Sequence, residues 1–283
     1  MRSLNTLDGL PIHWRQWARR ALTSARGTVL LVHGLGEHVG RYEALAELLN
    51  EWGWHVVGYD QRGHGASGGG RGDLSHADAL LEDLALVVDS VRQDVHLGKG
   101  PLVLLGHSLG ALVAARFVLG QLQRAPWARP VDALALSSPA LQADLSVAQQ
   151  AMLALGRRIL PHLAVDNGLK PQWLSRRSEV VQAYEDDPLV HDRISGTLAA
   201  FITDSGPQLL QAAPHWTLPT LLLWGGADRC VNPAGSAAFA AAAPASLVQA
   251  HCLEAAFHEI FNDLDPEREQ ALQHLRHWLD ERG

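Results

Sequence analysis

One serine has neighbours that suit nucleophilic catalysis. Ser108 is the centre of residues 106–110, Gly-His-Ser-Leu-Gly, which fit the pattern Gly-x-Ser-x-Gly. A short apolar run ends at Leu105 and a helical pattern begins at Leu109, so the serine lies on a turn between a strand and a helix. Small neighbours let such a turn pass close to adjacent strands, and the helix directs N–H groups toward developing negative charge. The pattern predicts a nucleophile; the plainer alternative is a serine that only caps the helix.

A serine hydroxyl is a weak nucleophile, so it needs a base and a group that orients the base. For this kind of turn both are expected downstream, in the order Ser, Asp, His. Asp228 follows the apolar run 221–224, at the end of a strand where open α/β sheets place their sites. His258 follows the run 247–253 and is selected among 15 histidines by its placement. Asp228 as a turn former and His251 as the base remain alternatives.

Developing negative charge on a substrate carbonyl also needs hydrogen-bond donors. Residues 33–36 read His-Gly-Leu-Gly directly after an apolar run, and the glycines allow a backbone amide to face the substrate. We expect the N–H groups of Leu35 and Leu109 to form the oxyanion hole. Gly34 and His107, beside these donors and the serine, are expected substrate contacts.

The elements that must position these residues follow from hydrophobic periodicity. Short apolar runs alternate with longer helical patterns. Strands are expected at residues 10–17, 28–33, 55–59, 101–105, 131–136, 220–224 and 247–253. Helices are expected at residues 42–52, 77–95, 109–119, 234–245 and about 266–279. This alternation predicts an α/β fold, a mostly parallel sheet with helices on both faces.

One long segment interrupts the alternation. Residues 140–213 show helical pattern and loop without a convincing buried strand. We expect them to form a helical cap or lid inserted between residues 1–139 and 214–283, which together make the core. The apolar stripe over residues 145–159 is interpreted as the underside of that lid, and a membrane-surface helix is the alternative.

Composition excludes several classes of protein. The 283 residues carry 23 Lys plus Arg and 30 Asp plus Glu, a formal net charge of −7, with 47% hydrophobic residues. Such a chain is globular, and without a basic run it is not expected to bind nucleic acid. No apolar stretch of about 18 residues and no secretory leader is recognised, and two cysteines make no disulfide framework. We expect a cytoplasmic protein, with peripheral membrane contact left open.

A metal or phosphate site is not favoured. The loop that holds His33, Glu37 and His38 does not offer three ligands at convincing spacing, and its glycines already have a role. Residues 258–262 do not complete His-Glu-x-x-His, and the glycine-rich residues 68–72 lack the Gly-Lys-Ser/Thr ending of a phosphate loop. No metal and no cofactor are expected.

Several short motifs occur together in one order. They are residues 33–38, 41–42, 60–67, 106–110, 175–176, 187–189 and 227–229. In these motifs the chain resembles the monoacylglycerol lipase and lysophospholipase family of α/β-hydrolases over nearly its whole length. The resemblance implies a core with a helical cap over an apolar acyl tunnel. It also assigns Ser108, Asp228 and His258 to the triad and Leu35 and Leu109 to the oxyanion hole. Ala111 replaces a glycine usual in the family.

The resemblance implies a serine carboxylic-ester hydrolase that acts on monoacylglycerols or similar lipid esters through an acyl-enzyme. Lysophospholipase, general carboxylesterase and acyltransferase activities are alternatives on the same triad, and a non-catalytic ligand-binding homologue is the alternative of another class. Four further residues in or beside the cap are expected to contact the substrate: Met152, Leu155, Trp173 and Trp216. The cap departs most from the family, so acyl-chain preference transfers least.

Overall fold

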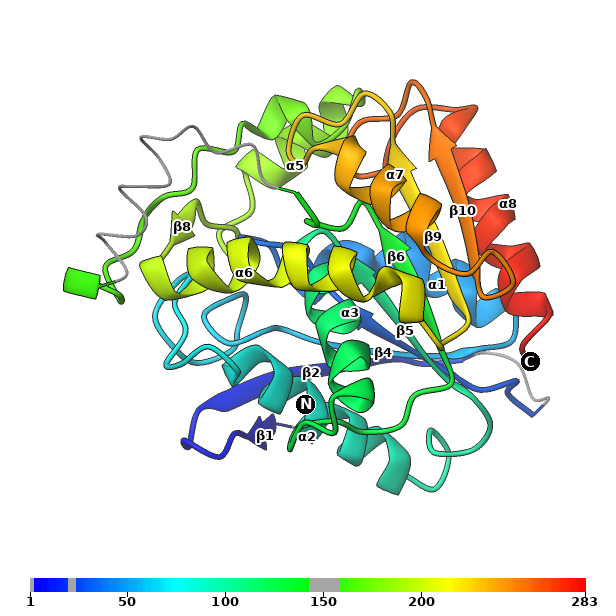
Figure 1. The fold of residues 1–283 in the computed structure, drawn as a ribbon, viewed down its shortest axis with the longest axis horizontal. Helices are drawn as coiled ribbons and strands as arrows, with labels where there is room; N and C mark the ends of the chain where they lie inside the picture. Colours follow the sequence, from blue (N-terminus) through cyan, green and yellow to red (C-terminus); the bar gives the residue numbers. More distant parts are fainter. Residues whose placement is uncertain (1–2, 20–23, 143–157) are drawn as a thin grey trace.

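A twisted, mostly parallel sheet forms the centre of the protein (Figure 1). The structure is a computed structural model and describes residues 3–19, 24–142 and 158–283. Eight strands follow the order β1-β2-β4-β3-β5-β6-β9-β10. Their bounds are β1 Ser3–Asn5, β2 Pro11–Trp17, β3 Thr28–Val32, β4 His55–Tyr59, β5 Leu102–His107, β6 Ala133–Ser137, β9 Thr220–Gly225 and β10 Val248–Leu253. All neighbours from β4 to β10 pair in parallel, and β2 is antiparallel to both β1 and β4.

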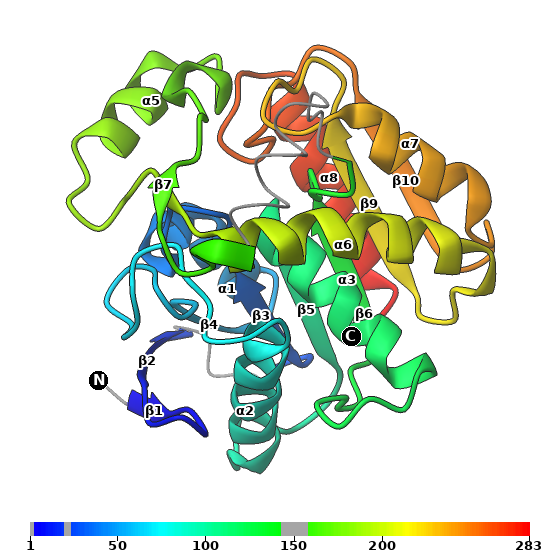
Figure 2. The ribbon, with the colours of Figure 1, turned by 60° about the vertical axis from the view of Figure 1, so that its left-hand side comes forward.

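Helices cover both faces of the sheet (Figure 2). They are α1 Glu43–Glu51, α2 Ala79–Gln93, α3 Leu109–Leu122, α5 Ser178–Glu185, α6 Gly196–Ala212, α7 Pro233–Ala242 and α8 Glu267–Asp280. Short 3-10 turns are η1 Val39–Tyr42, η2 Pro171–Trp173 and η3 Ala213–His215. In Figure 2, α6 crosses over α3, which it also contacts, and α5 lies at the outer edge.

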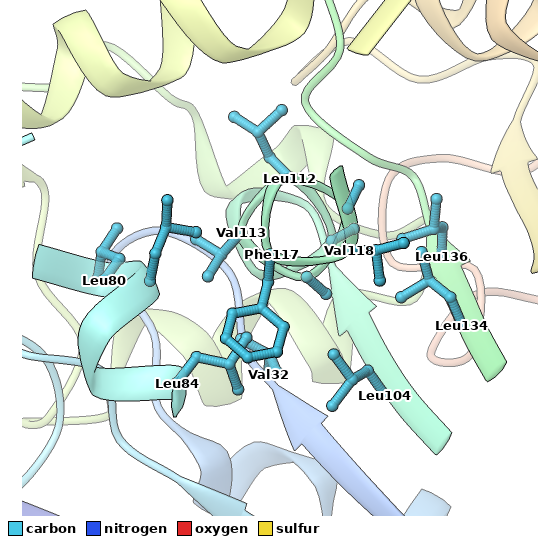
Figure 3. Packing of buried hydrophobic residues seen from close by; sticks show 14 of the residues in the cluster. Val32, Leu80, Leu84, Leu104, Leu112, Val113, Phe117, Val118, Leu134 and Leu136 are labelled. Carbon is cyan, nitrogen blue, oxygen red and sulfur yellow. The ribbon is translucent and has the colours of Figure 1, made fainter. Parts of the chain in front are cut away.

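Alternation of side chains along the central strand explains the two layers. Leu30 and Val32 of β3 belong to the core on the α2 and α3 side, whereas Val29 and Leu31 belong to the core on the α1 and α8 side. Figure 3 shows Phe117 of α3 packed among side chains of α2, β3 and β5. Both faces of β3 are therefore buried, as in parallel sheets generally.

The expected core elements are confirmed, with strand ends within two residues and helix ends within three. The segment between β6 and β9, called here the inserted segment, differs from expectation in one respect. It contains a two-stranded antiparallel ribbon, β7 (Val165–Asp166) and β8 (Arg193–Ile194), besides α5 and α6. Two-residue strands are too short to show a periodic pattern, which is why the sequence did not predict them.

Most of the apolar stripe expected in this segment, residues 145–157, lies outside the described residues, and Ile159 at its end is 62% exposed. None of the helices in the described ranges combines the length and the apolar composition needed to cross a bilayer.

Candidate active site

Ser108 lies on the tight turn between β5 and α3. Its backbone angles, φ 54° and ψ −118°, are in the left-handed half of dihedral space that non-glycine residues avoid. The turn is tightly packed, because a Cβ built on Gly106 or Gly110 would lie only 2.5 or 2.1 Å from a backbone atom. The Ser108 N–H donates to the carbonyl of Ser137 in β6 at 2.9 Å. Strained backbone of this kind is held by its surroundings and is common at catalytic residues.

Asp228 and His258 form a buried hydrogen-bonded pair. Asp228 follows β9, and its Oδ2 lies 2.7 Å from Nδ1 of His258. The other carboxylate oxygen accepts the N–H groups of Cys230 and Val231 at 2.7 and 3.2 Å, so the carboxylate has a fixed orientation. The backbone carbonyl of His258 accepts the Ser138 hydroxyl at 2.8 Å. Hydrogen bonds therefore fix both members of the pair, the carboxylate of Asp228 and the backbone of His258.

The electrostatics of His258 suit a base. Burial by itself disfavours the charged imidazolium, but the carboxylate of Asp228, its hydrogen bond and the nearby Glu259 outweigh burial. The pKa of His258 is consequently raised above the ordinary value of 6.5.

The structure brings the three predicted triad residues to the same end of the sheet. The His258 ring lies 4.7 Å, centroid to centroid, from the ring of His107, the residue before Ser108. Ser108 and Asp228 line one cavity. His251, the alternative base, lies within β10 and stacks at 3.7 Å on His274 of α8, away from this cavity.

Both predicted oxyanion donors belong to residues that line the same cavity as Ser108. Leu109 is the first residue of α3, so its N–H has no acceptor within the helix. Leu35 lies in the loop after β3. Its neighbour Gly34 is directly behind the serine, because a Cβ on Gly34 would lie 3.3 Å from Cβ of Ser108.

The cavity beside Ser108 has a volume of about 790 Å³. Apolar side chains from the segment between β6 and β9 form much of its wall: Leu160, Leu163, Val165, Leu169, Ile194 and Ile202. Arg229 and Asn232 add polar groups close to Asp228. A large concave surface with few polar groups is typical of sites for small apolar ligands.

Of the four substrate contacts expected in or beside the cap, one lines the cavity, one lies in the core and two fall outside the described residues. Trp173 lines the cavity. Trp216 is 1% exposed in the hydrophobic core, packs edge-on against Phe239 and donates from Nε1 to Thr220, so it is a core residue and not a cavity residue. Met152 and Leu155 lie outside the described residues.

His107 and Gly34 support the site from behind and are not among the residues that line the cavity. Nδ1 of His107 lies 3.0 Å from the hydroxyl of Ser137, and burial lowers the pKa of His107 to about 4. The Gly34 N–H donates to Glu37 at 2.6 Å.

A buried ion network behind His107 was not predicted from the sequence. Arg41 donates to Glu37 at 2.6 Å and to Glu259 at 2.7 Å, and the Tyr42 hydroxyl donates to Glu37 at 2.6 Å. Burial raises the pKa of Glu37, but Arg41 and its other neighbours prevail and lower it to about 2. Glu37 and Arg41 are four residues apart, and this spacing is the one sequence feature that could have suggested the pair. Glu259 could not have been found in this way, because it is 218 positions from Arg41.

His33, Glu37 and His38, which were considered as metal ligands, have hydrogen-bond partners within the protein. His33 bonds backbone groups of Gly34 and Gln61, and His38 bonds Asp187. In the described part of the chain, the one close group of three metal-ligating residues is Asp228, Cys230 and His258, which contains the hydrogen-bonded pair itself.

Comparison with known proteins gives consistent matches. The family profile described as "Serine aminopeptidase, S33" matches residues 23–265. A monoacylglycerol lipase of Mycolicibacterium smegmatis is 32% identical over 261 residues, which cover 91% of this chain and 89% of the relative. An uncharacterized abhydrolase domain-containing protein of Dictyostelium discoideum is 31% identical over 281 residues, 99% of this chain, and the chain spans 29% of its length.

Among solved structures, a Paleococcus ferrophilus monoacylglycerol lipase matches with a TM-score of 0.82 and 35% identity over 96% of this chain and 99% of that one. The profile spans most of the chain, and the fold and the strained serine turn agree with it. The chain belongs to the serine aminopeptidase S33 family of α/β-hydrolases, together with the monoacylglycerol lipases.

Proposed function

We propose that the protein is a serine carboxylic-ester hydrolase of lipid esters with monoacylglycerol-like substrates. The observation that carries the proposal is the Asp228–His258 hydrogen bond beside the strained Ser108, at an apolar cavity. In this mechanism Ser108 attacks the ester carbonyl carbon while His258 takes the hydroxyl proton. Asp228 holds the imidazole tautomer and stabilises its charged form.

The remaining steps use the same groups. The N–H groups of Leu35 and Leu109 stabilise the oxyanion of the tetrahedral intermediate. When the carbonyl re-forms, the bond to the alcohol breaks and His258 returns the proton to the leaving oxygen. Water, deprotonated by His258, then attacks the acyl-enzyme, and the fatty acid leaves as Ser108 regains its proton.

The cavity favours esters with an apolar acyl chain over peptides with a free amino terminus. An aminopeptidase needs a negative group for the substrate ammonium. In the described residues that line the cavity, Asp228 is the one carboxylate, and it is already bonded to His258. The apolar wall instead suits an acyl chain, and the monoacylglycerol lipases among the relatives support this substrate class.

We also propose that residues 140–213 act as a cap on a core made of residues 1–139 and 214–283. Support comes from the cavity wall, where Leu160, Leu163 and Val165 of this segment face the site. The same three side chains are more than half exposed, so the rim of the cavity is apolar on its outer side. Such a rim suits peripheral contact with a lipid surface.

The test of the chemistry is the Ser108→Ala variant. We expect hydrolysis of a p-nitrophenyl ester and covalent labelling by a fluorophosphonate probe to disappear, while thermal unfolding stays that of the parent. A Ser137→Ala variant is the matched control, because it removes the hydroxyl that bonds His107 and keeps the backbone carbonyl that bonds Ser108, and it should still be labelled. Retained turnover in Ser108→Ala contradicts the assignment, and an unlabelled parent favours a non-catalytic homologue.

The substrate class has its own test. A hydrolysis profile over monoacylglycerols, lysophospholipids, simple esters and an aminoacyl anilide should be highest for monoacylglycerols. Added glycerol separates hydrolysis from acyl transfer, because transfer raises the yield of glyceride at the expense of free fatty acid.

A further inference from the structure

Three histidines from three different segments lie in a row that begins in the loop of residues 33–37, called here the oxyanion loop. The ring of His33 lies 5.4 Å from that of His64, which lies 4.7 Å from that of His191. His33 follows β3, His64 is in the loop after β4, and His191 lies between α5 and β8. The proposed mechanism uses none of the three.

His33 fixes the peptide that carries a proposed oxyanion donor. Nε2 of His33 accepts the N–H of Gln61 at 2.8 Å, so the ring proton is on Nδ1, which donates to the Gly34 carbonyl at 2.8 Å. The Gly34 carbonyl and the Leu35 N–H belong to one planar trans peptide and point in opposite directions. Holding the carbonyl therefore sets the direction of the Leu35 N–H.

His191 holds the other side of the oxyanion loop. Its backbone N–H donates to the Gly36 carbonyl at 2.8 Å. Nδ1 of its ring accepts the Arg193 N–H at 3.1 Å, which leaves the proton on Nε2 to donate to the Gly63 carbonyl at 3.1 Å. The backbones of Gly36 and His191 are in close contact, since a Cβ on Gly36 would lie 2.3 Å from the His191 carbonyl oxygen. Gly36 also has φ +76°, a conformation that favours glycine.

Asp187 adds a second connection from the same turn. Its Oδ2 lies 2.8 Å from Nε2 of His38, the residue after the oxyanion loop. Its Oδ1 accepts the N–H of Leu189 at 2.9 Å, which orders the turn that leads to His191. Residues 187–191, all from the segment between β6 and β9, thus contact the oxyanion loop at Gly36 and the chain immediately after it.

We propose that His191, supported by Asp187, is a positioning residue that holds the oxyanion loop in its reactive shape. The inference rests on the proposed function, since it assumes that the Leu35 N–H stabilises an oxyanion. Its consequence is that the oxyanion hole is complete only when the turn of residues 187–191 is seated on the core. A displacement of about 1 Å in such a group is enough to cost about 10²-fold in rate.

The test compares three substitutions in the inserted segment. His191→Ala keeps the backbone bond to Gly36 but removes the ring that packs on His64 and bonds Gly63, so it tests whether that ring seats the turn of residues 187–191 on the core. His191→Gln restores an N–H donor at a similar distance from the backbone. His162→Ala is the matched control, because His162 lies in the same segment and bonds the core loop at Asp73 without touching the oxyanion loop. We expect His191→Ala to lower kcat by about 10- to 100-fold with KM changed less than about two-fold. His191→Gln should recover part of kcat, and His162→Ala should resemble the parent.

A second readout separates positioning from a general loss of structure. An alkyl trifluoromethyl ketone forms a hemiketal when Ser108 Oγ bonds its carbonyl carbon, the hydroxyl proton moves to His258, and the carbonyl oxygen becomes an oxyanion in the hole. Its inhibition constant should rise in His191→Ala by the factor by which kcat/KM falls, because both report the same charged oxygen. Thermal unfolding in the absence of substrate identifies any variant that does not fold. In that case Asp187→Ala, which removes the bond to His38, takes the place of His191→Ala.

Three results would overturn the positioning role: kcat of His191→Ala within about two-fold of the parent, a loss confined to KM, or an equal loss in His162→Ala. Failure of the underlying function is distinguishable, because the parent enzyme itself would then leave a fluorophosphonate probe unreacted at Ser108.

Discussion

A single buried hydrogen bond carries most of the chemistry proposed for this protein. His258 is buried, and without Asp228 its surroundings would favour the neutral ring so strongly that it would be a poor proton acceptor. The carboxylate at 2.7 Å reverses this preference. The same contact that fixes the tautomer therefore also raises the basicity of the residue that must take a proton from Ser108.

The raised pKa of His258 predicts the acid limb of the pH–rate profile. The base must be neutral to accept the serine proton, so activity falls as the pH drops through its pKa. Because that pKa lies above 6.5, half-maximal kcat/KM is expected above pH 6.5. Asp228→Asn should lower kcat by about 10⁴-fold and move the midpoint of the residual activity downward. A parent midpoint below 6.5, measured with an ester whose alcohol does not titrate, would contradict this.

Sequence reasoning located residues whose roles depend on local motifs and missed those that depend on distant contacts. Ser108 and Asp228 follow apolar strands whose ends meet at one edge of the sheet, so their position could be predicted. The role of Glu259 depends on Arg41, which is 218 positions away, and no local sequence pattern in either segment predicts this ion pair. Trp216 shows the reverse error, because a large apolar side chain near a cap fits a core equally well.

At the scale of elements, a buried arginine joins a loop to α2. Arg62, 2% exposed, donates through Nε and Nη2 to Asp83 of α2 at 2.6 and 2.8 Å and through Nη1 to Asp8 at 2.9 Å. It anchors the glycine-rich loop that His191 also contacts. The loop is thus bonded to α2 through Asp83 and to the inserted segment through His191.

Removal of this arginine should destabilise the fold. Arg62→Met leaves the Asp83 carboxylate buried without its partner, which costs about 3–5 kcal/mol of unfolding free energy. Arg129→Met is the matched control, because Arg129 also pairs with an aspartate of α2, Asp89, but both side chains are more than a third exposed. The control should lose less than about 1 kcal/mol. Urea unfolding of the two variants measures the difference, and equal losses would show that burial of the pair is unimportant.

Elements with a complete period could be predicted, and shorter ones could not. The strand at residues 28–32 is an unbroken apolar run with a glycine turn after it, so its type and ends were evident. The ribbon of β7 and β8 has only two residues in each strand, which is too few for a period of two to be recognised. The ribbon also depends on the pairing of residues 165–166 with residues 193–194, which are far apart in the sequence.

At the scale of the whole molecule, one of the contacts between the inserted segment and the core is a cluster of neutral histidines. His33, His64 and His191 are in contact, and burial lowers the pKa of each below 6.5, to about 4 for His191. Nε2 of His64 is buried and has no hydrogen-bond partner among the described residues, which also disfavours a proton there. This cluster is consequently arranged for neutral rings and not for charged ones.

Acid should therefore destabilise the molecule before its carboxylates titrate. In the unfolded chain His191 takes up a proton near pH 6.5, whereas in the folded protein it does so only near pH 4. Its contribution to the free energy of unfolding is therefore complete above pH 6.5 and is lost as the pH falls toward 4. His258, with its raised pKa, acts in the opposite direction, because it contributes stability below 6.5 that is lost as the pH rises through its folded-state pKa. The pKa of His107 is likewise lowered, to about 4, and burial also lowers the pKa values of His55, His251 and His274. Since these rings and the three of the cluster oppose His258 alone, the melting temperature should be lower at pH 5 than at pH 7. His191→Gln, which cannot take up a proton at this position, should show a smaller decrease. The prediction fails if the parent melts at the same or a higher temperature at pH 5, or if the variant loses as much as the parent.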